Sequence, residues 1–170
     1  YYLHNFLVAQ PDLNLPCEAV QQALLDVARF WLDRGVDGFR LDTINFYFHD
    51  DELRDNPALA PEDRNDSSAP AVNPYNWQRH LYSKNQPENI GFLERMRDLL
   101  DRYDARTLVG EVGDSHHSIE LMGEYTSGNR LHMAYSFEML GPRFDADHFR
   151  GQITEFFEKA AQFGIQDGEK

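Results

Sequence analysis

Apolar residues recur at helical spacing in three stretches of the chain, residues 18–34, 89–103 and 148–163. Gly35 follows the first stretch, at the position where a helix commonly ends in a glycine. This period predicts three amphipathic helices. Their apolar positions are Val20, Leu24, Val27, Ala28, Trp31 and Leu32 in the first, Ile90, Leu93, Met96, Leu99 and Leu100 in the second, and Phe149, Ile153, Phe156 and Phe157, predicted to face inward, in the third.

Short apolar runs lie between these helices. One run covers residues 36–41, a second is TLVG at residues 107–110, and a third covers residues 131–137. Runs this short, without strict alternation, are typical of strands buried on both faces of a parallel sheet. The order helix, strand, helix, strand, strand, helix predicts an α/β fold in which helices cover a parallel sheet.

Residues 43–87 separate the first two helix and strand units. They are rich in Asp, Asn, Pro and Ser and show no sustained period. A segment of this length is uncommon in a compact domain unless it is functional or contains small elements of its own. Its aromatic residues either face a ligand or pin the segment to the body of the protein, and the sequence leaves both open. They are Phe46, Tyr47, Phe48, Tyr75 and Trp77.

Composition narrows the range of partners. The chain has 170 residues, of which 41% are hydrophobic, enough for one sizeable core. Its 16 Lys and Arg against 29 Asp and Glu give a formal charge of -13. Such a charge repels phosphate backbones and anionic lipids, so we expect neither nucleic acid nor a membrane surface as a partner. An acidic surface is also typical of proteins adapted to high salt.

Cysteine content and targeting signals bear on location. Cys17, the one cysteine, cannot form a disulfide within the chain, which is compatible with a reducing cytoplasm. No apolar run reaches the length of about 18 residues that a membrane helix needs. The first residues, YYLHNFLVAQ, show no signal peptide. We therefore expect a cytoplasmic protein.

Two acidic residues stand at the ends of predicted strands, Asp42 after the first and Glu111 after the second. In a (β/α)8 barrel the catalytic groups come from the carboxyl ends of several strands, and neighbouring strands bring their side chains together. Two facing carboxylates are the working groups of a glycosidase: one attacks or stabilises the sugar cation, and the other protonates the leaving oxygen. Arg40 lies two residues before Asp42, on the same face of the strand. Its charge favours an ionised nucleophile.

Three motifs resemble those of glycoside hydrolase family 13, the α-amylase family. GFRLDTIN at residues 38–45 resembles the nucleophile motif, LVGEVGD at residues 108–114 resembles the acid-base motif, and QPDLN at residues 10–14 resembles the motif that closes the family's inserted domain B. The resemblance covers essentially the whole chain. It implies Asp42 as the nucleophile and Glu111 as the proton donor.

The resemblance also implies a fold and its boundaries. The chain is expected to form part of a (β/α)8 TIM barrel, about strands 4 to 6 with their helices. Residues 1–14 would be the end of domain B, and residues 15–170 the central part of the catalytic barrel, domain A. The family's early sugar-binding His motif and later His-Asp motif are missing, and the chain begins without Met. We expect an internal fragment that needs the remainder of the same polypeptide to complete the barrel and site.

Departures from the family pattern point to a subtype. Amylases with the inter-domain calcium carry a Lys-His pair at the positions of Asn45 and Phe46, so Phe46 implies an aromatic wall in place of calcium. Thr43 after the nucleophile resembles enzymes that prefer α-1,4 links, whereas Val there resembles oligo-1,6-glucosidases. Phe6 and Phe137 are expected to bind substrate as further walls of the sugar site, although either also suits a plain core position.

We expect no metal and no cofactor. Neither the pair His116 and His117 nor the run His49, Asp50 and Asp51 has the helical spacing or cysteine partner of a typical metal site.

The resemblance implies a retaining, exo-acting α-glucosidase that releases glucose from maltose-like oligosaccharides through a covalent glucosyl-Asp intermediate, with transglucosylation. The alternatives are a glucosyl-transferring isomerase, an oligo-1,6-glucosidase and a non-catalytic barrel relative. The presence of Arg40, Asp42 and Glu111 argues against the last.

Overall fold

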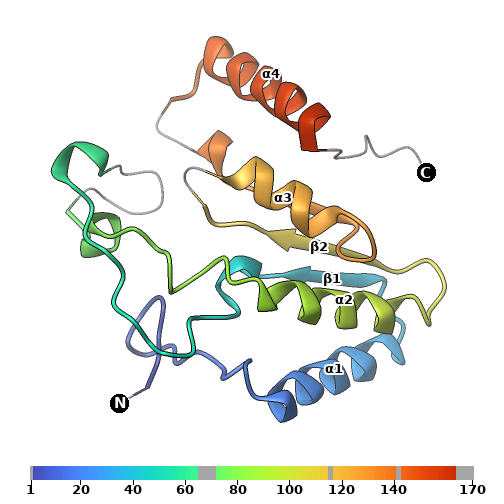
Figure 1. Ribbon diagram of the computed structural model, residues 1–170. Coiled ribbons are helices and arrows are strands. Elements are labelled where there is room, and N and C mark those ends of the chain that lie inside the picture. Colours follow the sequence, from blue (N-terminus) through green and yellow to red (C-terminus); the bar gives the residue numbers. More distant parts are fainter. Residues whose placement is uncertain (1, 65–71, 115–116, 141–142, 164–170) are drawn as a thin grey trace.

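The computed structural model describes residues 2–64, 72–114, 117–140 and 143–163 (Figure 1). Within these ranges the helices and strands alternate along the chain. They are α1 (Glu18–Leu32), β1 (Gly38–Leu41), α2 (Glu88–Leu100), β2 (Thr107–Glu111), α3 (Ser118–Thr126), β3 (Met133–Tyr135) and α4 (Ala146–Phe163). Short 3-10 turns lie between them: η1 (Ile44–Phe46), η2 (Pro61–Asp63), η3 (Pro74–Trp77) and η4 (Glu138–Leu140).

The described strands form one parallel sheet in the order β1, β2, β3. Leu41 lies opposite Gly110, and Glu111 lies opposite Tyr135, so the carboxyl ends of the strands share one edge. The helices follow one another in a row beside the strands (Figure 1), with α1 packed on α2 and α3 on α4. This confirms the predicted parallel sheet with covering helices.

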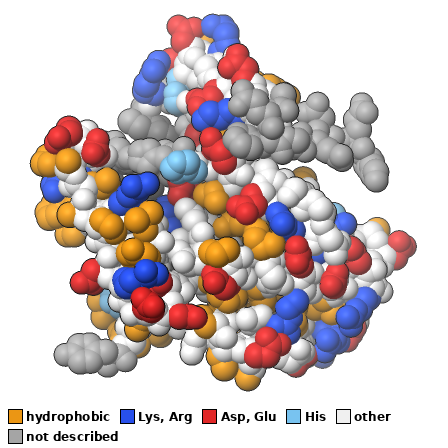
Figure 2. All heavy atoms as spheres, viewed as in Figure 1, with side chains coloured by type: hydrophobic (Ala, Val, Ile, Leu, Met, Phe, Trp, Pro, Cys, Tyr) orange, Lys and Arg blue, Asp and Glu red, His pale blue; other side chains and the backbone are white. Residues whose placement is uncertain are grey.

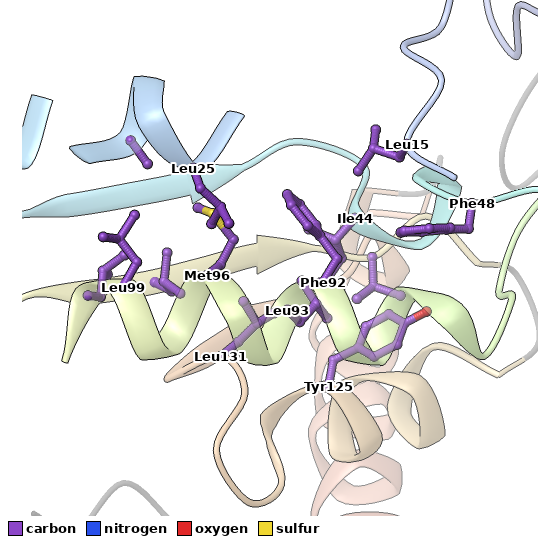
Figure 3. Close-up of a cluster of buried hydrophobic side chains, with 14 of the residues drawn as sticks. Leu15, Leu25, Ile44, Phe48, Phe92, Leu93, Met96, Leu99, Tyr125 and Leu131 are labelled. Carbon is purple, nitrogen blue, oxygen red and sulfur yellow. The ribbon is translucent and has the colours of Figure 1, made fainter. Parts of the chain in front are cut away.

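The core lies between the strands and the inner faces of α1 and α2 (Figure 3). Helix α2 contributes one continuous apolar stripe, as predicted. Its buried apolar residues are Phe92, Leu93, Met96, Leu99 and Leu100.

The predicted inner faces of two helices are partly wrong. In α1 the buried residues are Leu25, Ala28 and Leu32, whereas Val27 and Trp31 are 55% and 47% exposed. Val27 and Trp31 are four residues apart and therefore lie on one face of α1, which is exposed in this chain. In α4, Phe156 packs against the core, but Ile153 and Phe157 are 45% and 57% exposed because the helix meets α3 along one side only.

The sequence pattern missed α3 and overestimated the third strand, which is the three residues of β3 and not residues 131–137. Helix α3 has only nine residues, and Ser118, Ile119, Met122, Gly123 and Tyr125 are all buried. These positions share one face of the helix, but two of them are Ser and Gly, so a helix this short shows no clear apolar period in the sequence. With α3 in place, each pair of neighbouring strands is joined by a crossover that contains a helix.

The segment 43–87 is tied to the body at both ends. Tyr47 packs edge-on against Phe92 at 6.0 Å between ring centroids, and Phe48 is buried. Further out, the segment closes on itself through an antiparallel bridge between Ala58 and Gln78. Tyr47 and Phe48 therefore pin the segment to the body.

The surface matches the composition. On the face shown in Figure 2, acidic and basic side chains are interspersed, with apolar groups between them. No helix in the described parts of the chain is long and apolar enough to cross a bilayer.

Candidate active site

Arg40 links both acidic residues that the sequence singled out. Its Nη1 lies 2.7 Å from Oδ1 of Asp42, and its Nη2 pairs with Oε2 of Glu111. Asp42 directly follows β1, and Glu111 ends β2, the neighbouring strand. The predicted proximity of the two carboxylates is therefore confirmed, because one guanidinium contacts both.

The two carboxylates differ in environment. The side chain of Glu111 is 9% exposed, whereas that of Asp42 is 70% exposed in this chain. The pKa of Arg40 is raised above its usual value by the hydrogen bond to Tyr135 and by the contact with Asp42. Arg40 is therefore a fixed positive charge over the working pH range. A buried acid and an accessible carboxylate fit two different tasks.

Thr43 turns the chain immediately after Asp42. Its backbone is left-handed, with φ 40° and ψ 51°, and its carbonyl accepts a hydrogen bond from the amide of Phe46 at 2.9 Å. A β-branched residue rarely adopts this conformation, which costs roughly 1–2 kcal/mol. The turn places Ile44 and Asn45 fully inside the protein and leaves Asp42 at the edge of the sheet.

The predicted aromatic residues gather near this edge. The rings of Phe6 and Phe46 lie 5.2 Å apart, and Phe6 is half-exposed, so it is not a core residue of this chain. A Cβ atom at Gly113 would lie 3.2 Å from Phe46 and 3.9 Å from Phe137. The glycine thus lets both rings approach the loop that follows Glu111. Whether these rings bind a sugar stays a prediction.

A buried polar cluster next to these rings was not predicted. The side-chain nitrogen Nδ2 of Asn45 donates to Asn85 Oδ1 at 2.9 Å and to the backbone carbonyl of Gly113 at 3.0 Å. The side-chain oxygen Oδ1 of Asn45 accepts a hydrogen bond from the backbone amide of Gly113 at 3.0 Å. Lys84 Nζ lies 3.1 Å from Asp114 Oδ2 and donates to the same carbonyl at 3.0 Å. The cluster ties the end of the segment 43–87 to the loop after β2.

A cavity of about 340 Å³ adjoins this cluster. Its lining includes Tyr75, His80, Lys84, Asp114 and His117. Among the described residues, no group of three or more His, Cys, Asp and Glu is arranged to hold a metal ion. His116, part of one predicted non-metal pair, lies outside the described residues.

Residues 1–165 match the catalytic domain of α-amylases. The chain belongs to the α-amylase family. It is 61% identical over 165 residues to a protein of Rhizobium meliloti (strain 1021) named Probable alpha-glucosidase, a match that covers 96% of this chain and 30% of that protein. It is 39% identical over 141 residues to an Oligo-1,6-glucosidase of Bacillus sp. (strain F5), covering 81% of this chain and 25% of that protein.

A solved structure shows the same fold. The crystal structure of the alpha-glucosyl transfer enzyme XgtA superposes on 93% of this chain with a TM-score of 0.86 and 52% sequence identity, and the match covers 29% of that enzyme. The parallel strands described above are therefore part of the family's (β/α)8 barrel, as predicted. The chain spans less than a third of the length of these relatives. The proposed boundary between domains B and A, after residue 14, stays a prediction.

Proposed function

We propose that the polypeptide carrying this chain is a retaining α-glucosidase that releases glucose from the non-reducing ends of short α-1,4-linked glucosides such as maltose. The observation that carries the proposal is the pair Asp42 and Glu111, which end neighbouring strands and share the guanidinium of Arg40. Relatives named alpha-glucosidase and oligo-1,6-glucosidase support this substrate class.

In the proposed reaction, the carboxylate of Asp42 attacks the anomeric carbon of the terminal glucose. Glu111 gives its proton to the glycosidic oxygen as the bond to the leaving sugar breaks, which leaves a glucosyl ester on Asp42. Glu111 then takes a proton from a water molecule, whose oxygen attacks the same carbon and releases glucose. Two inversions at one carbon restore the original α configuration.

Substrate binding is assigned to Arg40, Thr43, Phe6 and Phe137. Aromatic rings at the edge of the sheet offer apolar walls to a sugar ring, and Thr43 follows the nucleophile directly. A single side-chain contact of this kind shifts a preference between two linkages by about 1–3 kcal/mol. Thr43 therefore favours α-1,4 links without excluding others. The partner is a small oligosaccharide or glucoside.

Transglucosylation is the second candidate, because XgtA is named an alpha-glucosyl transfer enzyme and is 52% identical to this chain. Transfer uses the same glucosyl ester but passes the glucose to a sugar hydroxyl instead of water. Chromatography of the products from maltose separates the two: hydrolysis gives only glucose, whereas transfer also gives longer or rearranged oligosaccharides.

The test uses the full-length polypeptide with maltose and isomaltose. Maltose is expected to be the better of these two substrates, and Asp42→Asn is expected to abolish turnover. The anomer is read with 4-nitrophenyl α-glucoside, whose leaving group is not a sugar, and proton NMR of the first glucose released from it is expected to show the α anomer. Initial release of β-glucose would contradict the mechanism. We expect the 170 residues alone to be inactive, because the structure describes three strands of an eight-stranded barrel.

A further inference from the structure

Tyr135 connects the two charged groups of the site. It is the last residue of β3 and lies opposite Glu111 in the sheet. Its hydroxyl donates a hydrogen bond to Oε2 of Glu111 at 2.7 Å and accepts one from Nε of Arg40 at 2.7 Å. Strands β1, β2 and β3 thus each contribute one member of a three-residue contact.

The direction of these hydrogen bonds follows from the groups involved. A guanidinium nitrogen only donates, so the phenol must accept from Arg40, and its own proton is directed to the carboxylate. Contact with Glu111, followed by burial, raises the pKa of the Tyr135 phenol. The phenol therefore keeps its proton at neutral pH and remains a donor.

Both donors reach the same oxygen of Glu111. Oε2 receives the phenol of Tyr135 and also Nη2 of Arg40. An oxygen that already accepts two hydrogen bonds, one of them from a cation, is the less favourable place for an added proton. The other oxygen, Oε1, is the more favourable one.

We infer that Tyr135 is a positioning residue that, together with Arg40, occupies Oε2 of Glu111 and directs the catalytic proton to Oε1. This inference rests on the proposed role of Glu111 as the proton donor. Tyr135 itself does not transfer the proton. It fixes the carboxyl plane, so that Oε1 faces the glycosidic oxygen when the substrate binds.

Tyr135→Phe removes the hydroxyl and keeps the ring, including its contact with Phe137 at 6.3 Å between centroids. General acid catalysis contributes about 10²–10⁴-fold to a reaction, and we assign roughly 10- to 100-fold of this to correct placement of the acid. We expect kcat/KM for maltose to fall by that factor. For 2,4-dinitrophenyl α-glucoside, whose leaving group departs without a proton, we expect a change of less than about threefold.

The ratio of the two kcat/KM values separates positioning from general damage, because the amount of folded enzyme cancels in it. Tyr103→Phe is the matched control: that phenol also lies against a carboxylate, Asp33 Oδ1 at 2.6 Å, but far from the carboxyl ends of the strands. The control is expected to leave both values unchanged.

Glu111→Gln, measured in parallel, shows which claim fails. If Glu111→Gln loses far more activity on maltose than on the dinitrophenyl glucoside and Tyr135→Phe does not, the positioning role is wrong while the proposed function stands. Equal losses of Tyr135→Phe on both substrates, or no loss on either, overturn the inference. If Glu111→Gln itself shows no dependence on the leaving group, the proposed function fails.

Discussion

The ion pair between Lys84 and Asp114 is expected to hold the segment 43–87 against the loop that follows Glu111. Both side chains are 6% exposed, and their charged atoms lie 3.1 Å apart. At that distance, with an effective dielectric constant of about 20, the attraction is roughly 5 kcal/mol before the cost of removing both ions from water. Because both side chains are buried, water does little to screen this attraction. The loss of one partner leaves the charge of the other buried without a counter-charge.

Lys84→Met removes the charge and nearly keeps the length of the side chain. Breaking a buried pair costs about 3–5 kcal/mol. Asp114 retains hydrogen bonds from the side chain of Asn85 and the amide of His117, both at 2.9 Å, so we expect the lower value, about 3 kcal/mol. This corresponds to a roughly 100-fold larger population in which the segment is detached.

Limited proteolysis of the native full-length protein measures this population, because cleavage within residues 43–87 follows the open fraction when opening is fast. Lys84→Met is expected to raise the cleavage rate by about 100-fold. The exposed pair Arg150 and Asp147 provides the control, and Arg150→Met is expected to have no effect. In the double variant with Asp114→Asn, the loss should be smaller than the sum of the single losses. Unchanged cleavage in Lys84→Met, or strictly additive losses, would refute the reasoning.

Two further predictions concern backbone strain and pH. Thr43→Gly is expected to raise the unfolding free energy by about 0.5–1 kcal/mol, because relief of about 1–2 kcal/mol of left-handed strain exceeds the entropic cost of glycine. Thermal unfolding checks this, and a lower melting temperature in Thr43→Gly than in Thr43→Ala would contradict it. Burial lowers the pKa of His80, which stacks on Tyr75 at 3.9 Å. The unfolded chain therefore takes up a proton near pH 6.5 that the folded form binds only at lower pH, so stability around residues 73–83 falls as the pH drops through 6.5. Hydrogen-exchange protection at pH 7.5 and 5.5 checks this, and an equally steep loss in His80→Gln would show that another group is responsible.

The sheet could be predicted from the sequence because each strand lies in a short apolar run that is followed by, or ends in, a polar residue. Local patterns fail where burial depends on neighbours. The buried face of α3 includes Ser118 and Gly123 and so shows no apolar stripe in the sequence, whereas Val27 and Trp31 have the spacing of a buried face but are 55% and 47% exposed. Apolar character alone does not reveal which face of a helix meets a neighbour.

The candidate site could also be predicted only in part from the sequence. Arg40 and Asp42 are two residues apart on one strand end, and Glu111 ends the neighbouring strand, so their proximity follows from local pattern and sheet topology. The roles of Tyr135 and Lys84 were not predicted. Tyr135 contacts Arg40, 95 residues away along the chain, and Lys84 contacts Gly113, 29 residues away. No period along the chain records such pairs, and only folding brings them together.

The assignment of Asp42 and Glu111 is tested most directly by azide rescue of two variants of the full-length protein, with 2,4-dinitrophenyl α-glucoside as the substrate. In Asp42→Gly, azide takes the place of the nucleophile and attacks the α-glucoside once, which gives β-glucosyl azide. In Glu111→Ala, Asp42 still forms its ester, and azide displaces it in a second inversion, which gives α-glucosyl azide. NMR of the two products is expected to show these opposite anomers. The same anomer from both variants, or no acceleration by azide in either, would contradict the assignment.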